Sequence, residues 1–281
     1  MTTDPFRTRD HVTDFDDKVA AYRERSAATR GRLRTVTVRT GDAAGEVLDL
    51  FFPAPDSHPA ADDAARPVHL FIHGGYWRMF SKDDFSYVAD TVTATGAIAA
   101  VLDYALMPSV RLSDIVGQVR RARRWIADTI AEHGGDPARV TVSGHSAGAH
   151  LATFLFSADQ PDPVAGALLL GGLYDLRPLQ SSFLQPLIGL TDEEVRSLSP
   201  IDHRHSPATR VRVLWGDRET PPFHEQGRAF AGHLRDQGAD VVAMALADAD
   251  HMSSALDLGS PDTETGRHLV GLIAGEGDRR P

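Results

Sequence analysis

One stretch near the middle of the chain constrains its fold more than any other. Residues 140–142 are β-branched and predict a buried strand, residues 144–148 read Gly-His-Ser-Ala-Gly, and residues 149–155 predict a helix. A G-x-S-x-G turn between a strand and a helix holds its serine in strained dihedral angles with the hydroxyl exposed. We therefore predict that Ser146 is a nucleophile and that the N–H of Ala147 faces an oxyanion. The alternative is a glycine-rich helix entry with an idle serine.

Strand-like and helix-like segments alternate along most of the chain. Apolar or alternating runs predict strands at 35–38, 48–52, 68–72, 97–102, 140–142, 164–170, 210–215 and 241–246. Helical patterns occur at 15–28, 83–95, 112–133, 149–155 and 264–274. This order predicts an α/β fold, a mostly parallel eight-stranded sheet with helices on both faces. The first two strands flank a turn at 41–45 and predict an antiparallel hairpin at one edge.

Two segments lie outside this alternation. Residues 1–34 predict a polar segment with one helix that covers the rim of the active site, the alternative being a frayed tail. Residues 174–209 are short apolar pieces broken by prolines and predict a small cap. In that cap, Phe183, Leu184 and Leu187 are candidate pocket walls, with simple surface packing as the alternative. Residues 53–67 predict a proline-rich surface loop. We expect residues 1–281 to form a single domain.

Charge and composition exclude several classes of protein. The formal net charge is −10, so no nucleic-acid partner is expected, and the arginines among residues 120–124 predict a solvated helix face. The chain has no cysteine, which excludes disulfides and thiolate metal sites. No apolar run could cross a bilayer, and no signal-peptide pattern is present, so we expect a cytoplasmic protein without a membrane partner. His69 and His73 lie too far apart along a strand to share a metal.

A second glycine-bearing turn follows the strand at 68–72. His73, Gly74 and Gly75 lead into Tyr76 and Trp77. Glycines after a central strand let the backbone approach a ligand, and an HGGG-type loop in this place supplies the oxyanion hole of lipases and esterases. We predict that the amides of Gly74 and Gly75 join that of Ala147, although a tyrosine replaces the third glycine. The alternative is an ordinary tight turn.

A serine nucleophile needs a general base, and one histidine is well placed to be that base. His251 is the only histidine directly after the last predicted strand. The carboxyl ends of parallel strands meet at one edge of an α/β sheet, where ligands bind. We therefore predict that His251 accepts the proton of Ser146 and later returns it to the leaving group.

The acid that orients His251 is harder to assign from the residues alone. Asp217 and Glu219 both follow the strand at 210–215, and Asp248 is a more distant candidate. Asp250 adjoins the histidine and is poorly placed to fold back onto its ring. With either Asp217 or Glu219, the chain order is serine, acid, histidine, which is the order of α/β-hydrolases.

The chain resembles the kynurenine formamidase (arylformamidase) branch of the α/β-hydrolase fold and its bacterial esterase-like relatives. The resemblance covers about residues 10 to 275 and is carried by the segments 48–53, 73–77, 144–151, 172–176, 198–200 and 216–223. His-Gly-Gly-Tyr-Trp is fairly characteristic of that branch, whereas the serine motif is general to the fold. The family's Gly-x-x-acid-Ser/Thr-Pro-x-Phe segment maps its acid onto Glu219, where formamidases often carry aspartate. Met252 stands where the family usually has phenylalanine.

The resemblance implies hydrolysis of N-formyl-L-kynurenine to L-kynurenine and formate. Tyr76 and Trp77 are predicted to flank an aromatic substrate, with core or rim packing as the alternative. His145 is a third predicted substrate contact.

Three hypotheses about function remain at this stage. The first is an aryl formamidase, the second a carboxylesterase or related amidase, and the third a catalytically inactive binding module on the same fold. All three take a small molecule and call for no metal and no organic cofactor. The oligomeric state stays open, with a homodimer among the alternatives.

Overall fold

The computed structural model describes residues 3–43, 45–54 and 65–275, and within them eight strands form one sheet. The sheet order is β1-β2-β4-β3-β5-β6-β7-β8. The strands are β1 (Thr35–Arg39), β2 (Val47–Phe51), β3 (Arg66–Ile72), β4 (Ile98–Leu102), β5 (Gly135–His145), β6 (Gly166–Leu170), β7 (Arg210–Gly216) and β8 (Val241–Leu246). The pairs β1–β2 and β2–β4 are antiparallel, and every other pair is parallel. The predicted sheet and its edge hairpin are confirmed.

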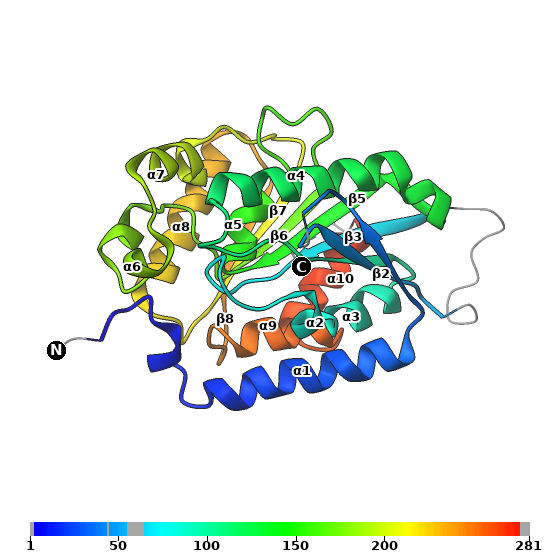
Figure 1. The fold of residues 1–281 in the computed structure, drawn as a ribbon, viewed down its shortest axis with the longest axis horizontal. Coiled ribbons are helices and arrows are strands. Elements are labelled where there is room, and N and C mark those ends of the chain that lie inside the picture. The colour runs from blue at the N-terminus through cyan, green and yellow to red at the C-terminus, as the bar shows by residue number, and fades with distance from the viewer. Residues whose placement is uncertain (1–2, 44, 55–64, 276–281) are drawn as a thin grey trace, which may run out of the picture.

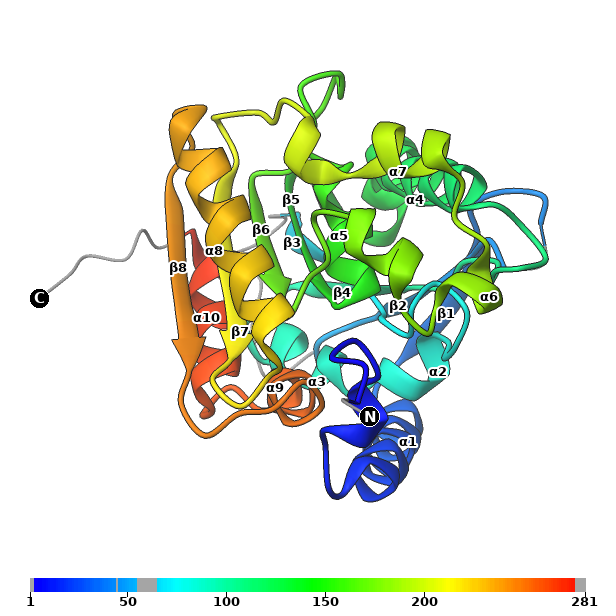
Figure 2. The same cartoon turned by 90° about the vertical axis from the view of Figure 1, so that its left-hand side faces the viewer.

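Helices cover both faces of this sheet (Figure 1 and Figure 2). One face carries α4 (Leu112–Thr129), α5 (Ala147–Thr153) and α8 (Pro221–Asp236), with the short α6 (Gln185–Ile188) and α7 (Asp192–Leu198) beside them. The other face carries α1 (Phe15–Arg32), α2 (Lys82–Phe85), α3 (Val88–Ala94), α9 (Ser253–Leu256) and α10 (Glu264–Ala274). The sheet is therefore the middle of three layers, with an apolar core on each side.

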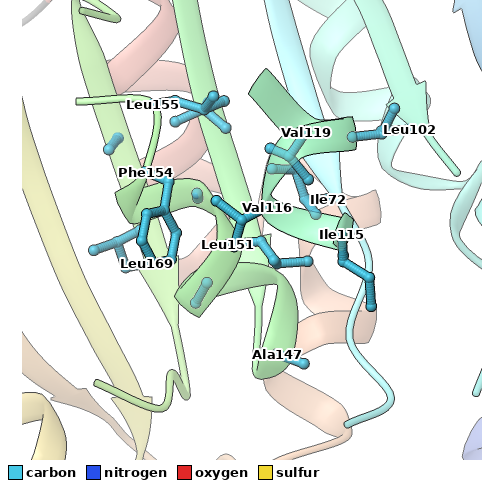
Figure 3. Close-up of a cluster of buried hydrophobic side chains, with 14 of the residues drawn as sticks. Ile72, Leu102, Ile115, Val116, Val119, Ala147, Leu151, Phe154, Leu155 and Leu169 are labelled. Carbon is cyan, nitrogen blue, oxygen red and sulfur yellow. The ribbon is translucent and has the colours of Figure 1, made fainter. Parts of the chain in front are cut away.

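The packing of α4 shows how the sequence pattern produces one of these cores. Its apolar residues recur three and four positions apart, so they form one stripe that faces the sheet. Figure 3 shows Ile115, Val116 and Val119 of this stripe gathered with Leu151 of α5, and all four are buried. After a 3-10 turn, Gly134 ends the segment with φ of 80° in the left-handed region, where glycine is favoured.

Some predicted boundaries are wrong. The predicted helix at 83–95 is divided into α2 and α3, and at the break Tyr87 donates its backbone N–H to Ser26 Oγ of α1 at 3.3 Å. The last four residues of the predicted helix at 112–133 form the 3-10 turn instead. Most of the predicted loop at 53–67, and one residue of the turn at 41–45, lie outside the described residues.

The predicted N-terminal helix is confirmed as α1, and two of its side chains fix it to the rest of the fold. Tyr22 is fully buried and donates its hydroxyl to the carbonyl of Met252 at 2.6 Å. Near the C-terminal end of the helix, Arg30 pairs with the buried Asp49 at 2.6 Å. The helix therefore packs against both the loop after β8 and the hairpin. Among the described residues, no helix is long and apolar enough to cross a membrane.

Candidate active site

The turn between β5 and α5 is strained at Ser146. Its backbone has φ of 56° and ψ of −118°, a region that L-residues rarely adopt. A Cβ at Gly144 would lie 2.2 Å from the carbonyl oxygen of Gly148, and one at Gly148 would lie 2.0 Å from that of Ile72. Only glycine fits at either position. The sequence thus produces the sharp strand–serine–helix turn that the motif predicts.

One carboxylate is in contact with the predicted general base. Glu219 Oε2 lies 2.8 Å from His251 Nδ1, and the two side chains are 0% and 6% exposed. The other carboxylate oxygen accepts the N–H of Gly216 at 2.8 Å. Asp217, in contrast, is exposed to solvent. The geometry therefore favours Glu219 over Asp217 as the partner of His251.

The other two acids near this histidine are engaged elsewhere or face solvent. Asp250 accepts the backbone N–H groups of Met252 and Ser253, both at 2.8 Å, and pairs with Lys18 at 3.3 Å. Its carboxylate therefore binds the turn that leads into α9 and does not fold back onto His251. Asp248 is exposed.

The loop after β3 lies directly against the serine turn. A Cβ at Gly74 would lie 2.8 Å from the carbonyl oxygen of His145 and 3.2 Å from Ser146 Cβ, so a side chain here would separate the two segments. Gly75 has φ of 105°, and Tyr76 and Trp77 have φ of 50° and 58°. This run of positive φ angles folds the loop into a tight turn beside Ser146.

Ser146 and His251 line the same cavity, which encloses about 220 Å³. Its walls are mainly apolar and come from distant parts of the chain: Phe15, Tyr76, Phe80, Phe183, Leu184 and Met252. Two of the predicted cap residues therefore reach the cavity. The third, Leu187, is 38% exposed and is not among the described residues that line it.

Trp77 does not contact this cavity, and we withdraw it as a substrate contact. It is completely buried, and its indole N–H donates to His150 Nδ1 at 3.3 Å. Tyr76 does line the cavity, and its hydroxyl donates to the carbonyl of Phe6. Of the two predicted aromatic contacts, therefore, only Tyr76 reaches the cavity.

His145 lies beside the predicted base and keeps its backbone in place. Its Nε2 donates to the carbonyl of His251 at 2.8 Å, and the ring centroids are 4.5 Å apart. Burial, together with the neighbouring His251, holds the pKa of His145 well below its ordinary value. His145 is therefore neutral near pH 7, with its unprotonated Nδ1 on the side of Gly74.

The described part of the chain shows no group of three or more residues suited to hold a metal ion. His69 is instead satisfied within the sheet by Thr141 Oγ1 at 2.8 Å and Ser143 Oγ at 2.7 Å.

Comparisons with known proteins identify the family. Residues 69–254, about two thirds of the chain, match the α/β hydrolase fold. The chain belongs to the α/β hydrolase family. It is a hydrolase, since relatives within this fold include formamidases and esterases.

Two relatives and one solved structure show what the chain is similar to. This α/β hydrolase is 29% identical over 253 residues to a kynurenine formamidase of Danio rerio, covering 85% of this chain and 83% of the relative. It is 31% identical over 242 residues to esterase LipQ of Mycobacterium tuberculosis, covering 78% of this chain and 57% of that relative. In fold it resembles a hyperthermophilic esterase of the archaeon Pyrobaculum calidifontis, with a TM-score of 0.71 and 19% identity. The match covers 92% of this chain and 90% of that structure. The resemblance predicted from the sequence is confirmed.

Sequence patterns missed part of the cavity of this hydrolase. Arg7, Thr8, Arg9 and Asp10 line it from the N-terminal segment, and Arg78 lines it from the loop after β3. None of them belongs to a recognisable motif. The only signal was the expectation that residues 1–34 cover the rim, which gave no individual residue.

Proposed function

We propose that this α/β hydrolase is a serine hydrolase that removes a small acyl group, formyl, from an aryl amine, with N-formyl-L-kynurenine as the substrate. The observation that carries the proposal is the buried Glu219–His251 pair, whose histidine lines the same cavity as the strained Ser146. The formamidase relative, similar over most of both chains, supports the choice of substrate.

In the proposed mechanism, Ser146 Oγ attacks the formyl carbon while His251 Nε2 takes its proton. Glu219 accepts the Nδ1–H of the ring and stabilises the imidazolium that forms. The amides of Gly74, Gly75 and Ala147 would stabilise the oxyanion, each contributing about 2.7–4 kcal/mol to the transition state. The C–N bond then breaks, and the aryl amine leaves with the proton held by His251.

The second half of the reaction regenerates the enzyme. Water attacks the formyl–Ser146 ester, with His251 now acting as base, and formate leaves. An aryl amine leaves more readily than an alkyl amine because its nitrogen lone pair is delocalised into the ring, so ester-cleaving groups suffice. The aromatic walls of the cavity support an aryl leaving group.

Two segments are proposed to set specificity. The described residues 3–34 form a cover and residues 174–209 a cap, and the two are joined where Asp4 Oδ2 accepts the N–H of Phe183 at 2.5 Å. Phe15 and Phe183 bring one wall from each segment. We include a cytoplasmic location in the proposal, on the grounds of composition.

The alternative function is a carboxylesterase or related amidase, favoured by the similarity to the esterase LipQ. Turnover of N-formyl-L-kynurenine beside a short p-nitrophenyl ester separates the two, with Ser146→Ala as the blank. A strong preference for the formamide supports the proposal, and turnover of the ester alone favours the alternative. Turnover that survives in Ser146→Ala would contradict both.

A further inference from the structure

The cavity of this acidic protein has a positively charged rim. Three arginines line it, Arg7, Arg9 and Arg78, against one aspartate, Asp10. The chain as a whole carries a formal net charge of −10. A local excess of cations in a cleft attracts anionic ligands that the rest of the surface repels.

Two of these arginines already have partners. Arg9 Nη1 lies 2.7 Å from Asp16, and its guanidinium lies 4.5 Å from the ring centroid of Phe15. Arg7 lies 3.8 Å from Asp10 and 4.7 Å from the ring centroid of Phe183. The guanidinium groups of Arg7 and Arg9 are therefore already paired with neighbouring carboxylates and aromatic rings.

Arg78 is different. Its Nε is buried and has no hydrogen-bond partner among the described residues, and none of the carboxylates described in the structure forms an ion pair with it. A buried guanidinium N–H without an acceptor is costly, and a carboxylate satisfies it best because the two planar groups match in a bidentate pair.

The backbone fixes Arg78 relative to the reacting centre. Its N–H donates to the carbonyl of Gly75 at 3.0 Å, which closes the turn that carries the proposed oxyanion donors. The residue before it, Trp77, is anchored by its indole N–H and by its carbonyl, which accepts the N–H of Met107 at 2.8 Å. The backbone from which the Arg78 side chain extends is therefore held next to the proposed oxyanion hole.

We propose that Arg78 binds a carboxylate on the leaving group of the substrate, so that the preferred substrates are aryl formamides or esters that carry this negative charge. The inference rests on the proposed function, because it assumes that the reaction takes place at Ser146. Arg78 is a specificity residue here and takes no part in bond breaking.

Two matched substrate pairs test the inference. The formamide pair is N-formyl-L-kynurenine and the same compound with its carboxylate converted to a carboxamide. The ester pair is 4-acetoxybenzoate and 4-acetoxybenzamide. Wild type should prefer the charged member of a pair that it cleaves. In Arg78→Met, KM for that member should rise roughly 10- to 100-fold, the worth of one hydrogen bond to a charged group.

The pattern of kinetic constants separates binding from a structural role. The contact exists before and during the reaction, so kcat should stay within about twofold. The neutral member should show little change in either constant, which also reports that the variant is folded. Arg78→Lys should restore part of the preference, since it keeps the charge and loses the planar fork. Arg124→Met, exposed on α4 and outside the cavity, is the control and should behave as wild type.

The inference would be overturned if wild type showed no preference for the charged member. It would also be overturned if Arg78→Met lost the same activity on both members of a pair, or if Arg9→Met abolished the preference and Arg78→Met kept it. Failure of the proposed function gives a different pattern. If only the ester pair is cleaved and its discrimination still depends on Arg78, the formamide assignment fails and the carboxylate site stands.

Discussion

Replacement of Glu219 by glutamine is the most direct test of how His251 is held. The two carboxylate oxygens have separate partners, His251 Nδ1 at 2.8 Å and the N–H of Gly216 at 2.8 Å. Both partners act as donors to the carboxylate. A glutamine offers one acceptor and one donor in the same place, so either orientation of its amide leaves a mismatch.

Each orientation has a definite consequence. If the amide NH₂ faces His251, the ring must carry its proton on Nε2, and it can no longer accept the proton of Ser146. If the NH₂ faces Gly216, two donors meet at a buried site, which costs about 1–3 kcal/mol. The imidazolium also loses a hydrogen bond to a charged group, worth about 1.5–3 kcal/mol. Together these effects correspond to a fall in kcat of roughly 10²- to 10⁴-fold.

The assay is kcat for a short p-nitrophenyl ester and for N-formyl-L-kynurenine, measured beside the urea midpoint of each variant. Asp217→Asn is the matched control. Because Asp217 is exposed, this control should change kcat by less than about twofold. If Glu219→Gln keeps kcat within tenfold of wild type, or if Asp217→Asn loses more, the assignment of the acid is wrong.

Three further predictions concern stability. Ser146→Gly should raise the free energy of unfolding by about 1 kcal/mol relative to Ser146→Ala, since glycine relieves the strain at φ of 56° and alanine does not; equal denaturant midpoints would argue against strain. Gly148→Ala should lower the free energy of unfolding by about 3 kcal/mol or more, because its new Cβ would clash with the backbone. Gly232→Ala is the matched control on α8, with nothing within 4 Å of its new Cβ, and it should raise the free energy of unfolding by about 0.5–1 kcal/mol in the same denaturation experiment. Burial lowers the pKa of His69 to about 3, so the unfolded chain binds its proton first and stability falls as pH drops below about 6.5. The loss is about 1.4 kcal/mol per pH unit for this group, and urea unfolding at pH 7 and pH 5 should show a smaller difference in His69→Gln.

Much of the fold was predictable because local patterns and tertiary packing agree over most elements. β8 and α10 have the predicted boundaries, since each is a clear run bounded by turn residues. The divided helix α2–α3 was not predictable. At its break the N–H of Tyr87 donates to Ser26 Oγ, a contact between residues 61 positions apart that no short window of sequence contains.

The candidate site was predictable to the extent that motifs fix backbone geometry. The tight turn that strains Ser146 leaves no room for a side chain at Gly144 or Gly148, and this pair of glycines is visible in the sequence. The orientation of Trp77 was not visible, because it depends on successive positive φ angles in residues other than glycine. The position of Arg78 in the cavity was not predictable for the same reason, since this residue follows that irregular turn.

The choice between Glu219 and Asp217 shows where sequence reasoning ends. Both follow β7 by a few residues, and both have a carboxylate. Glu219 turns inward because its own N–H and its Oε1 both bond to Gly216, which closes a tight loop around the end of the strand. Asp217 instead donates its N–H to the carbonyl of Leu246, and its side chain stays in solvent. The backbone of the turn, more than the identity of the acid, therefore decides which carboxylate meets His251. A family motif reflects such a turn, so the resemblance favoured Glu219, whereas the two acids could not be distinguished by composition.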